Sequence, residues 1–176
     1  EHNILFDHHG LYDASIHVPL VISYPAVIKQ GVKVGALVQH VDIAPTLISL
    51  AAIEDLKFDG QSLLGVANGD EQPLRPFVFS EENYYEHKEC IRTSSYKMIR
   101  ALDDGICSRC GIMHGDKIEL YNLNEDPSEN SNLALREKGA VELLTAKLDE
   151  YKRKFAVKRK GTEERMLDKA ISDIKF

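Results

Sequence analysis

The sequence is poor in cysteine, in positive charge and in long apolar runs, and each shortage excludes a class of protein. Three cysteines among 176 residues cannot all pair within the chain, so this is not a disulfide-stabilised scaffold. Asp and Glu outnumber Lys and Arg by 28 to 22, and the resulting net charge of −6 argues against a general nucleic-acid-binding protein. No apolar run approaches the roughly 18 residues that a membrane span needs, so no span is predicted.

What is present is ordinary globular composition, with 43% apolar and 28% charged residues. The length predicts one domain, or one domain with an appendage, and is sufficient to bury a sizeable core. The chain opens at Glu1 without a methionine or an apolar leader. We therefore expect a fragment whose beginning is missing.

The first 70 residues carry one strand pattern and one helix pattern. The β-branched run from Ile16 to Tyr24 predicts a strand buried on both faces, as parallel strands are. Residues 41–51 predict a helix that begins at Asp42 as N-cap and buries one apolar face.

The second half of the chain alternates between short strand patterns and then becomes helical. Residues 67–76 are rich in Asn, Gly, Asp and Pro and predict a linker. Alternating apolar residues predict strands at 77–79, 90–93, 96–100 and 117–121, with an exposed loop at 81–88. A helix is expected from a cap at Ser131 or Asn132 to Phe155, with a break at Gly161.

Five motifs occur in the order in which they occur in a known family. They are Phe6-Asp7-His8-His9-Gly10-Leu11-Tyr12-Asp13 leading into Val18-Pro19-Leu20, then His40-Val41-Asp42-Ile43-Ala44-Pro45-Thr46-Leu47, Phe58-Asp59-Gly60-Gln61-Ser62-Leu63, Ile91-Arg92-Thr93 with Tyr96-Lys97, and Glu119-Leu120-Tyr121-Asn122-Leu123 with Asp126-Pro127-Ser128-Glu129 and Asn132-Leu133-Ala134. Together they resemble the C-terminal portion of the sulfatase family, within the alkaline-phosphatase-like superfamily. Each motif alone is weak, but five in order over residues 1–135 make a strong signal.

The resemblance implies an α/β fold, namely the C-terminal part of an alkaline-phosphatase-like sulfatase with a smaller subdomain of antiparallel sheet and helix. Residues 1–70 would form the C-terminal edge of the catalytic α/β domain. Residues 71–160 would form the subdomain, and residues 161–176 a tail or short helix.

The chemistry implied by the resemblance is hydrolysis of a sulfate ester at a divalent metal, Ca²⁺ or Mg²⁺, by a formylglycine nucleophile. Formylglycine is made in the family from a Cys/Ser-x-Pro-x-Arg motif, and this sequence contains none. The family's Asp metal ligands are also missing. We therefore expect that the chain holds neither cofactor and is inactive alone.

Histidines near the start of the chain are the remaining candidates for the site. In the family a Lys that contacts the sulfate often lies a few residues before the Val-Pro-Leu strand, and His8 occupies that position here. Histidine can do a similar task as a cation, an N–H donor or a general acid, so His8 is predicted to be catalytic and substrate-binding. His2 is predicted to line the substrate site. His9 is the alternative to His8 because the alignment can shift by one residue, and both could instead be loop histidines.

Two thiols lie close together at Cys107 and Cys110, with His114 nearby. A structural zinc site needs four ligands, and no fourth is evident in sequence. A hairpin tip with two thiols, reduced or bridged, is the alternative, and no metal site is predicted.

Two other functions remain open. One is a phosphodiesterase or phosphonate hydrolase of the same superfamily, which shares the metal scaffold but has a different nucleophile. The other is a non-catalytic interaction module that self-associates through a truncated apolar face.

Overall fold

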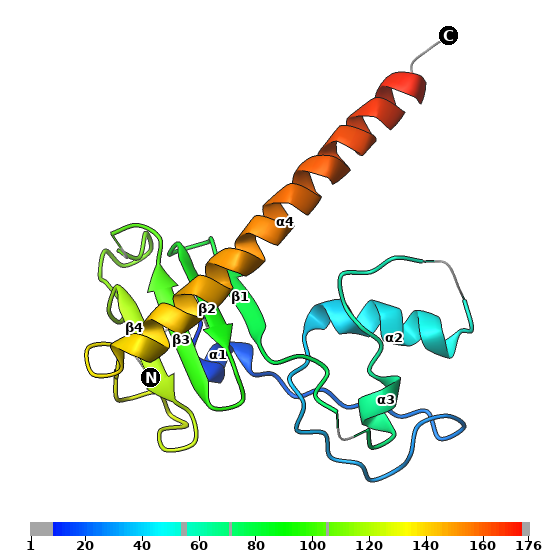
Figure 1. Cartoon of the computed structure of the whole chain (residues 1–176), viewed down its shortest axis with the longest axis horizontal. Coiled ribbons are helices and arrows are strands. Elements are labelled where there is room, and N and C mark those ends of the chain that lie inside the picture. Colours follow the sequence, from blue (N-terminus) through cyan, green and yellow to red (C-terminus); the bar gives the residue numbers. More distant parts are fainter. Residues whose placement is uncertain (1–8, 54–55, 71, 105, 174–176) are drawn as a thin grey trace. The chain divides into compact units, whose positions relative to one another are not determined.

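The computed structural model describes residues 9–53, 56–70, 72–104 and 106–173, with side chains to residue 156 (Figure 1). The chain divides into two compact units, residues 1–133 and 134–176, each considered by itself below. The first unit contains, in order, α1 (Asp13–Ile16), the 3₁₀ helix η1 (His40–Asp42), α2 (Ile43–Leu50), α3 (Leu64–Ala67) and four strands. In the part of the chain that the structure describes, no helix has the length and apolar character of a membrane span.

The four strands form one antiparallel sheet with the simple order β1-β2-β3-β4. They are β1 (Val78–Glu82), β2 (Lys88–Arg92), β3 (Tyr96–Ala101) and β4 (Ile118–Asn122), and each pairs with the next in sequence (Figure 1). This arrangement confirms the predicted antiparallel subdomain. The alternation that predicted these strands is carried by side chains buried on both faces. One face holds Ile91, Met98 and Leu120, all fully buried.

The other face of the sheet is covered by the start of the chain. Leu11 and Tyr12 pack with Cys90, Ile99 and Tyr121 into the apolar cluster of this unit. Because Cys90 pairs with Ile99 across the β2–β3 ladder, these two side chains point to the same face. Residues 9–16 therefore belong to the sheet, although about 60 residues separate them from β1 along the chain.

A buried ion network fixes this docking. The Lys97 ammonium is fully buried, 2.8 Å from Asp13 Oδ1 and 2.8 Å from Glu129 Oε1. The Asp13 backbone N–H donates to Glu129 Oε2 at 2.6 Å, and Arg92 Nη2 lies 3.2 Å from Asp13 Oδ2. Burial alone would raise the pKa of Asp13, but the hydrogen bond and charge of Lys97, with Arg92, bring it below its usual value. Three of the five sequence motifs thus meet in one structural network.

Helix α2 begins where the sequence predicts it, but Asp42 acts differently from the prediction. Its side chain does not cap α2; it is fully buried and accepts from the backbone N–H of Gln39 at 2.8 Å and of Gln61 at 2.9 Å. Arg75 Nη2 also donates to it. Asp42 is at the N-cap position of α2, as predicted, but its carboxylate bonds to donors of other segments and so joins η1 to residues 61 and 75.

The motif glycine at Gly60 is required by close packing against η1. A Cβ added there would overlap the Val41 carbonyl and lie 2.7 Å from Asp42 N. Gly60→Ala should therefore lower the free energy of unfolding by about 1–3 kcal/mol or more. Urea denaturation, with hydrogen exchange of the α2 amides, measures it. Gly35→Ala is the matched control because nothing lies within 4 Å of its added Cβ, and equal stability of both variants would contradict the packing.

Residues 17–24 do not form the predicted buried strand. After α1 ends at Ile16 the backbone has no regular structure, and Val18, Leu20 and Val21 are 52%, 45% and 88% exposed. A parallel strand needs neighbouring strands on which to form its ladder, and within the described ranges none lies beside this run. The apolar face predicted for α2 is also open, since Leu47 is 58% exposed.

The second unit consists mainly of one helix, α4 (Lys138–Asp173). Leu144 and Leu148 are buried, as the helical spacing predicts. The predicted start and break were both wrong. Asn132 does not cap the helix, because its side chain accepts from Leu120 N at 3.0 Å and donates to Ile118 O at 3.1 Å, which secures the edge of β4. Gly161 does not end α4, since one glycine costs only about 1 kcal/mol in a long helix.

Candidate functional site

The two predicted site residues, His2 and His8, lie outside the described residues. Their neighbour His9 is the first residue that the structure describes. The site is therefore built outward from His9 and from the side chains that surround it.

The segment that follows His9 is held by side chains of the sheet. The Gly10 backbone N–H donates to Glu82 Oε2 at 2.7 Å, and the Tyr12 hydroxyl donates to Glu119 Oε2 at 2.7 Å. Burial raises the pKa of Glu119 above its usual value, with Tyr12 and Tyr121 opposing that shift by hydrogen bonding to it. These bonds, with the ion network at Asp13, anchor residues 10–13 to the sheet.

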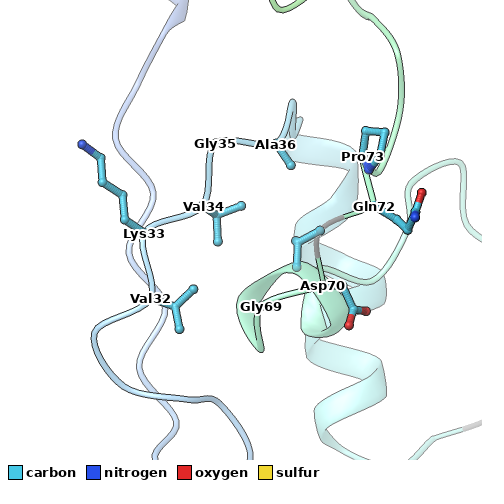
Figure 2. A pocket seen from close by; sticks show the side chains of 10 residues that line it. Val32, Lys33, Val34, Gly35, Ala36, Gly69, Asp70, Gln72 and Pro73 are labelled. Atoms are coloured by element: carbon cyan, nitrogen blue, oxygen red, sulfur yellow. The ribbon is translucent and has the colours of Figure 1, made fainter.

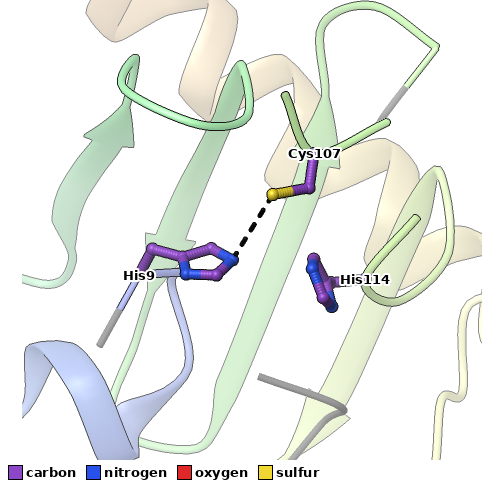
Figure 3. A group of neighbouring side chains, drawn as sticks. All are labelled: His9, Cys107 and His114. Atoms are coloured by element: carbon purple, nitrogen blue, oxygen red, sulfur yellow. Dashed lines mark hydrogen bonds between the residues drawn. The ribbon is translucent and has the colours of Figure 1, made fainter. Parts of the chain in front are cut away.

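His9 meets two side chains from the loop between β3 and β4, Cys107 and His114 (Figure 3). The Sγ of Cys107 lies 3.8 Å from His9 Nε2, and the two imidazole rings have centroids 5.1 Å apart. One ring nitrogen of each histidine and the Cys107 sulfur all lie within 4.8 Å of one another. His114 and Cys107 are buried and His9 is half-buried, so the group is screened from solvent.

The loop that carries these thiols is a closed turn. The Cys107 backbone N–H donates to Ile112 O at 2.9 Å, and the Gly111 backbone N–H donates to Cys107 O at 2.8 Å. Gly111 has φ +72°, a conformation that favours glycine. The turn brings the Cys110 sulfur to 3.1 Å from His114 Nε2. All three cysteines are free thiols in the structure, so no disulfide fixes this geometry.

The neighbours of His114 are charged and buried, which the sequence did not predict. Residues 81–88 were expected to be an exposed loop, but Glu86 and Lys88 are each 2% exposed. Lys88 Nζ lies 3.3 Å from Glu86 Oε1 and also donates to the His114 carbonyl. The expectation is confirmed for Asn83, Tyr84 and His87, which are exposed, and is wrong for Glu86 and Lys88, because the paired charges and the backbone acceptor satisfy Lys88 inside the fold. Burial lowers the pKa of His114, so the ring is neutral at pH 7.

Among the residues that the structure describes, no group of carboxylates forms an oxygen-rich cation site. Ca²⁺ and Mg²⁺ prefer carboxylate, carbonyl and water oxygens. Asp42 and Asp13, which the sequence motifs contain, are occupied by Arg75 and by Lys97 with Arg92. Within the described ranges the metal-binding side chains that gather in a group of three are those of His9, Cys107 and His114, which offer nitrogen and sulfur. These residues do not fit the hard cation that the family resemblance implies.

A separate cavity of about 410 Å³ lies between residues 32–36 on one side and residues 69–70 and 72–73 on the other (Figure 2). Val32 and Val34 point toward its interior, while the Lys33 ammonium points away from it (Figure 2). Of the charged lining residues, Asp70 would repel an anion and the Lys33 ammonium points away, so the cavity presents no cation to a charged ester.

Comparison with known proteins identifies relatives of this chain. A family model described as "N-sulphoglucosamine sulphohydrolase, C-terminal" matches residues 1–155. The chain is 28% identical over 165 residues to an N-acetylglucosamine-6-O-sulfatase of Bacteroides thetaiotaomicron, covering 84% of this chain and 27% of that protein. It is 32% identical over 138 residues to human arylsulfatase K, covering 72% of this chain and 24% of the relative. The chain thus spans about a quarter of the length of these curated relatives.

Solved structures resemble the chain in the same way. A structure of the protein BT4656 in complex with its substrate, D-glucosamine-2-N,6-O-disulfate, aligns with a TM-score of 0.61 and 25% identity. That alignment covers 74% of this chain and 27% of the other. A putative sulfatase from Bacteroides thetaiotaomicron aligns with a TM-score of 0.50 and 30% identity, covering 62% of this chain and 23% of that one.

Proposed function

The chain belongs to the sulfatase family, as the C-terminal portion of its fold, and we propose that the protein it belongs to hydrolyses sulfate esters. The match of the family model over residues 1–155 is the observation that carries this proposal. The ordered motifs support it, because each of them makes a structural contact. Their side chains and backbone amides bind the start of the chain to the sheet, and α2 and β4 to neighbouring segments.

We propose a sulfated amino sugar as the substrate class. A relative is named for N-acetylglucosamine 6-O-sulfate, and a solved relative was bound to a disulfated glucosamine. Both alignments cover about three quarters or more of this chain.

Formylglycine and a divalent cation, Ca²⁺ or Mg²⁺, would supply the nucleophile and the charge stabilisation when bound. Neither is proposed for this chain. The 176 residues contain no Cys/Ser-x-Pro-x-Arg, and the carboxylates of Asp13 and Asp42 are already paired. Residues outside this chain would have to provide both, so the chain alone should release no sulfate.

The contribution of this chain is to position groups at the substrate. Residues 10–13, which follow His8 and His9 in sequence, are held against the sheet by four side chains: Glu82, Lys97, Glu119 and Glu129. We expect this anchor to serve His8, the residue proposed to contact the sulfate. A histidine there would donate an N–H bond to the ester oxygens or protonate the leaving group. His2 is proposed to line the same substrate site.

The exposed apolar residues of α2 and of the run after α1 support the same proposal. Val21 and Leu47 are more than half exposed, and Val18, Leu20 and Ile43 on the same two segments are exposed as well. Exposed apolar surface of this kind marks a contact surface. We propose that the catalytic portion of the enzyme covers it; association between copies of the chain is the alternative.

The test is a sulfate-release assay on the complete protein, with glucosamine 6-sulfate as substrate. The expected result is release of inorganic sulfate by the complete protein and none by residues 1–176 alone. A phosphonate monoester run in parallel serves as the comparison. Turnover of the phosphonate without sulfate release would replace the sulfatase with the phosphoryl-transfer alternative, and turnover of neither would favour an interaction module.

A further inference from the structure

We propose that the chain binds a zinc ion through His9, Cys107 and His114, with Cys110 as the fourth ligand. The sequence places Cys107, Cys110 and His114 together but leaves the set one ligand short. The fold supplies that ligand, because it brings His9 across 98 positions of sequence to the Cys107 sulfur.

The ligand types select the metal. Zn²⁺ takes sulfur and nitrogen in tetrahedral sites, often as two cysteines and two histidines, with two to four residues between the cysteines. Two residues lie between Cys107 and Cys110, and three lie between Cys110 and His114. Bound at about 2.3 Å to sulfur and about 2.0 Å to nitrogen, the ligands of such a site lie about 3–4 Å from each other. The observed separations of 3.8 Å for Cys107 Sγ to His9 Nε2 and 3.1 Å for Cys110 Sγ to His114 Nε2 are close to this.

The backbone of the turn that carries Cys107 and Cys110 is held in place by hydrogen bonds without a metal. The two backbone hydrogen bonds between Cys107 and residues 111–112, and the antiparallel bridge between Ile106 and Met113, hold its ends together. His9 is held from the other side, because Gly10 is bonded to Glu82 and the Ser15 hydroxyl donates to the His9 carbonyl at 3.3 Å. His9, Cys107 and His114 are therefore already together, whereas Cys110 contacts His114 but lies outside that group, so metal binding requires its sulfur to approach Cys107 and His9.

Unsatisfied polar atoms gather at the same place. Within the described part of the chain, the Nδ1 atoms of His9 and His114 are buried and have no hydrogen-bond partner. Glu82 Oε1 is also buried without a hydrogen-bond partner. The negative charges of Glu82 and Glu86 oppose the lowering of the His114 pKa by burial. A ligating histidine normally donates its second N–H to a carboxylate. Buried carboxylates beside buried imidazoles are the outer partners that such a site uses.

Binding releases protons and changes no oxidation state. The thiols of Cys107 and Cys110 lose their protons to solvent as two Zn–S bonds form, and the histidines bind as neutral rings. A disulfide between Cys107 and Cys110 is the competing arrangement and would leave no thiolate for the metal.

The experiment uses the full chain, reduced and freed of metal, and titrates it with Co²⁺ and then Zn²⁺. Bound Co²⁺ should give the near-ultraviolet absorption of thiolate ligation at one ion per chain, and Zn²⁺ should abolish it by displacement. Cys107→Ser, Cys110→Ser, His9→Gln and His114→Gln should each weaken binding by at least about 100-fold. His87→Gln is the matched control, because this exposed histidine pairs with Asp103 and should leave binding unchanged.

Circular dichroism of each variant separates loss of the site from loss of the fold. A wild-type chain that binds no Co²⁺, or binds it without thiolate absorption, would overturn the proposal. Cys110→Ser with unchanged affinity and unchanged absorption would overturn the four-ligand set. None of these readouts depends on sulfate hydrolysis, so the proposal stands or falls separately from the proposed function.

Discussion

Replacing Lys97 with methionine should lower the free energy of unfolding by about 3–5 kcal/mol, the cost of leaving a buried charge without its partner. The ammonium is fully buried between Asp13 and Glu129, each 2.8 Å away. Methionine fills a similar volume but removes the cation that lies between the two carboxylates, leaving Arg92 and His17 beside Asp13. Urea denaturation of the full chain, followed by circular dichroism, measures the change.

Lys154→Met is the control for this result. Lys154 pairs with Glu150 at 3.2 Å, but its side chain is 75% exposed, and exposed pairs contribute roughly 0–1 kcal/mol. If the two variants unfolded at the same urea concentration, the buried network would not be stabilising the fold.

Replacing His8 with alanine should lower turnover of sulfate esters by the complete protein by a factor of about 10². The expected loss is that of a general acid or of an N–H donor to the developing negative charge. The measurement is the rate of sulfate release at saturating substrate, in the complete protein rather than in the isolated chain. His87→Ala, an exposed histidine on the turn between β1 and β2, should leave the rate unchanged.

A normal rate for His8→Ala would remove that residue from the site. His8→Lys is then the informative variant, because the family often has lysine at this position. Retained turnover in His8→Lys, with loss in His8→Ala, would assign the role to positive charge or N–H donation rather than to proton transfer by the imidazole.

The sheet was predictable because its signal is local. Residues 96–100 and 117–121 alternate between side chains that lie on opposite faces, and β3 and β4 occupy nearly those ranges. What the alternation does not indicate is the partner of a polar residue in the pattern. Lys97 was part of a motif with no assigned task, and its partner Asp13 lies 84 positions away.

The predictions that failed depended on what surrounds a segment. The run at residues 16–24 has the composition of a buried strand, but composition cannot state whether neighbouring strands exist to pair with it. Asp42 and Asn132 are residue types that cap helices, yet in this fold donors and acceptors from distant segments use their side chains. The approach of His9 to Cys107 has no local spacing that could reveal it.

The docking of residues 9–16 on the sheet has a consequence for synthesis. At roughly 5–20 residues per second, about 6–23 s separate the synthesis of Asp13 from that of Glu129, 116 positions later. Within that interval the partners of Leu11 and Tyr12 are made one after another: Cys90 on β2, then Ile99 on β3 and last Tyr121 on β4. Residues 9–16 are thus made first but can complete their contacts only after β4 and Glu129 have been made. A chaperone that binds Leu11 and Tyr12 would act during this interval.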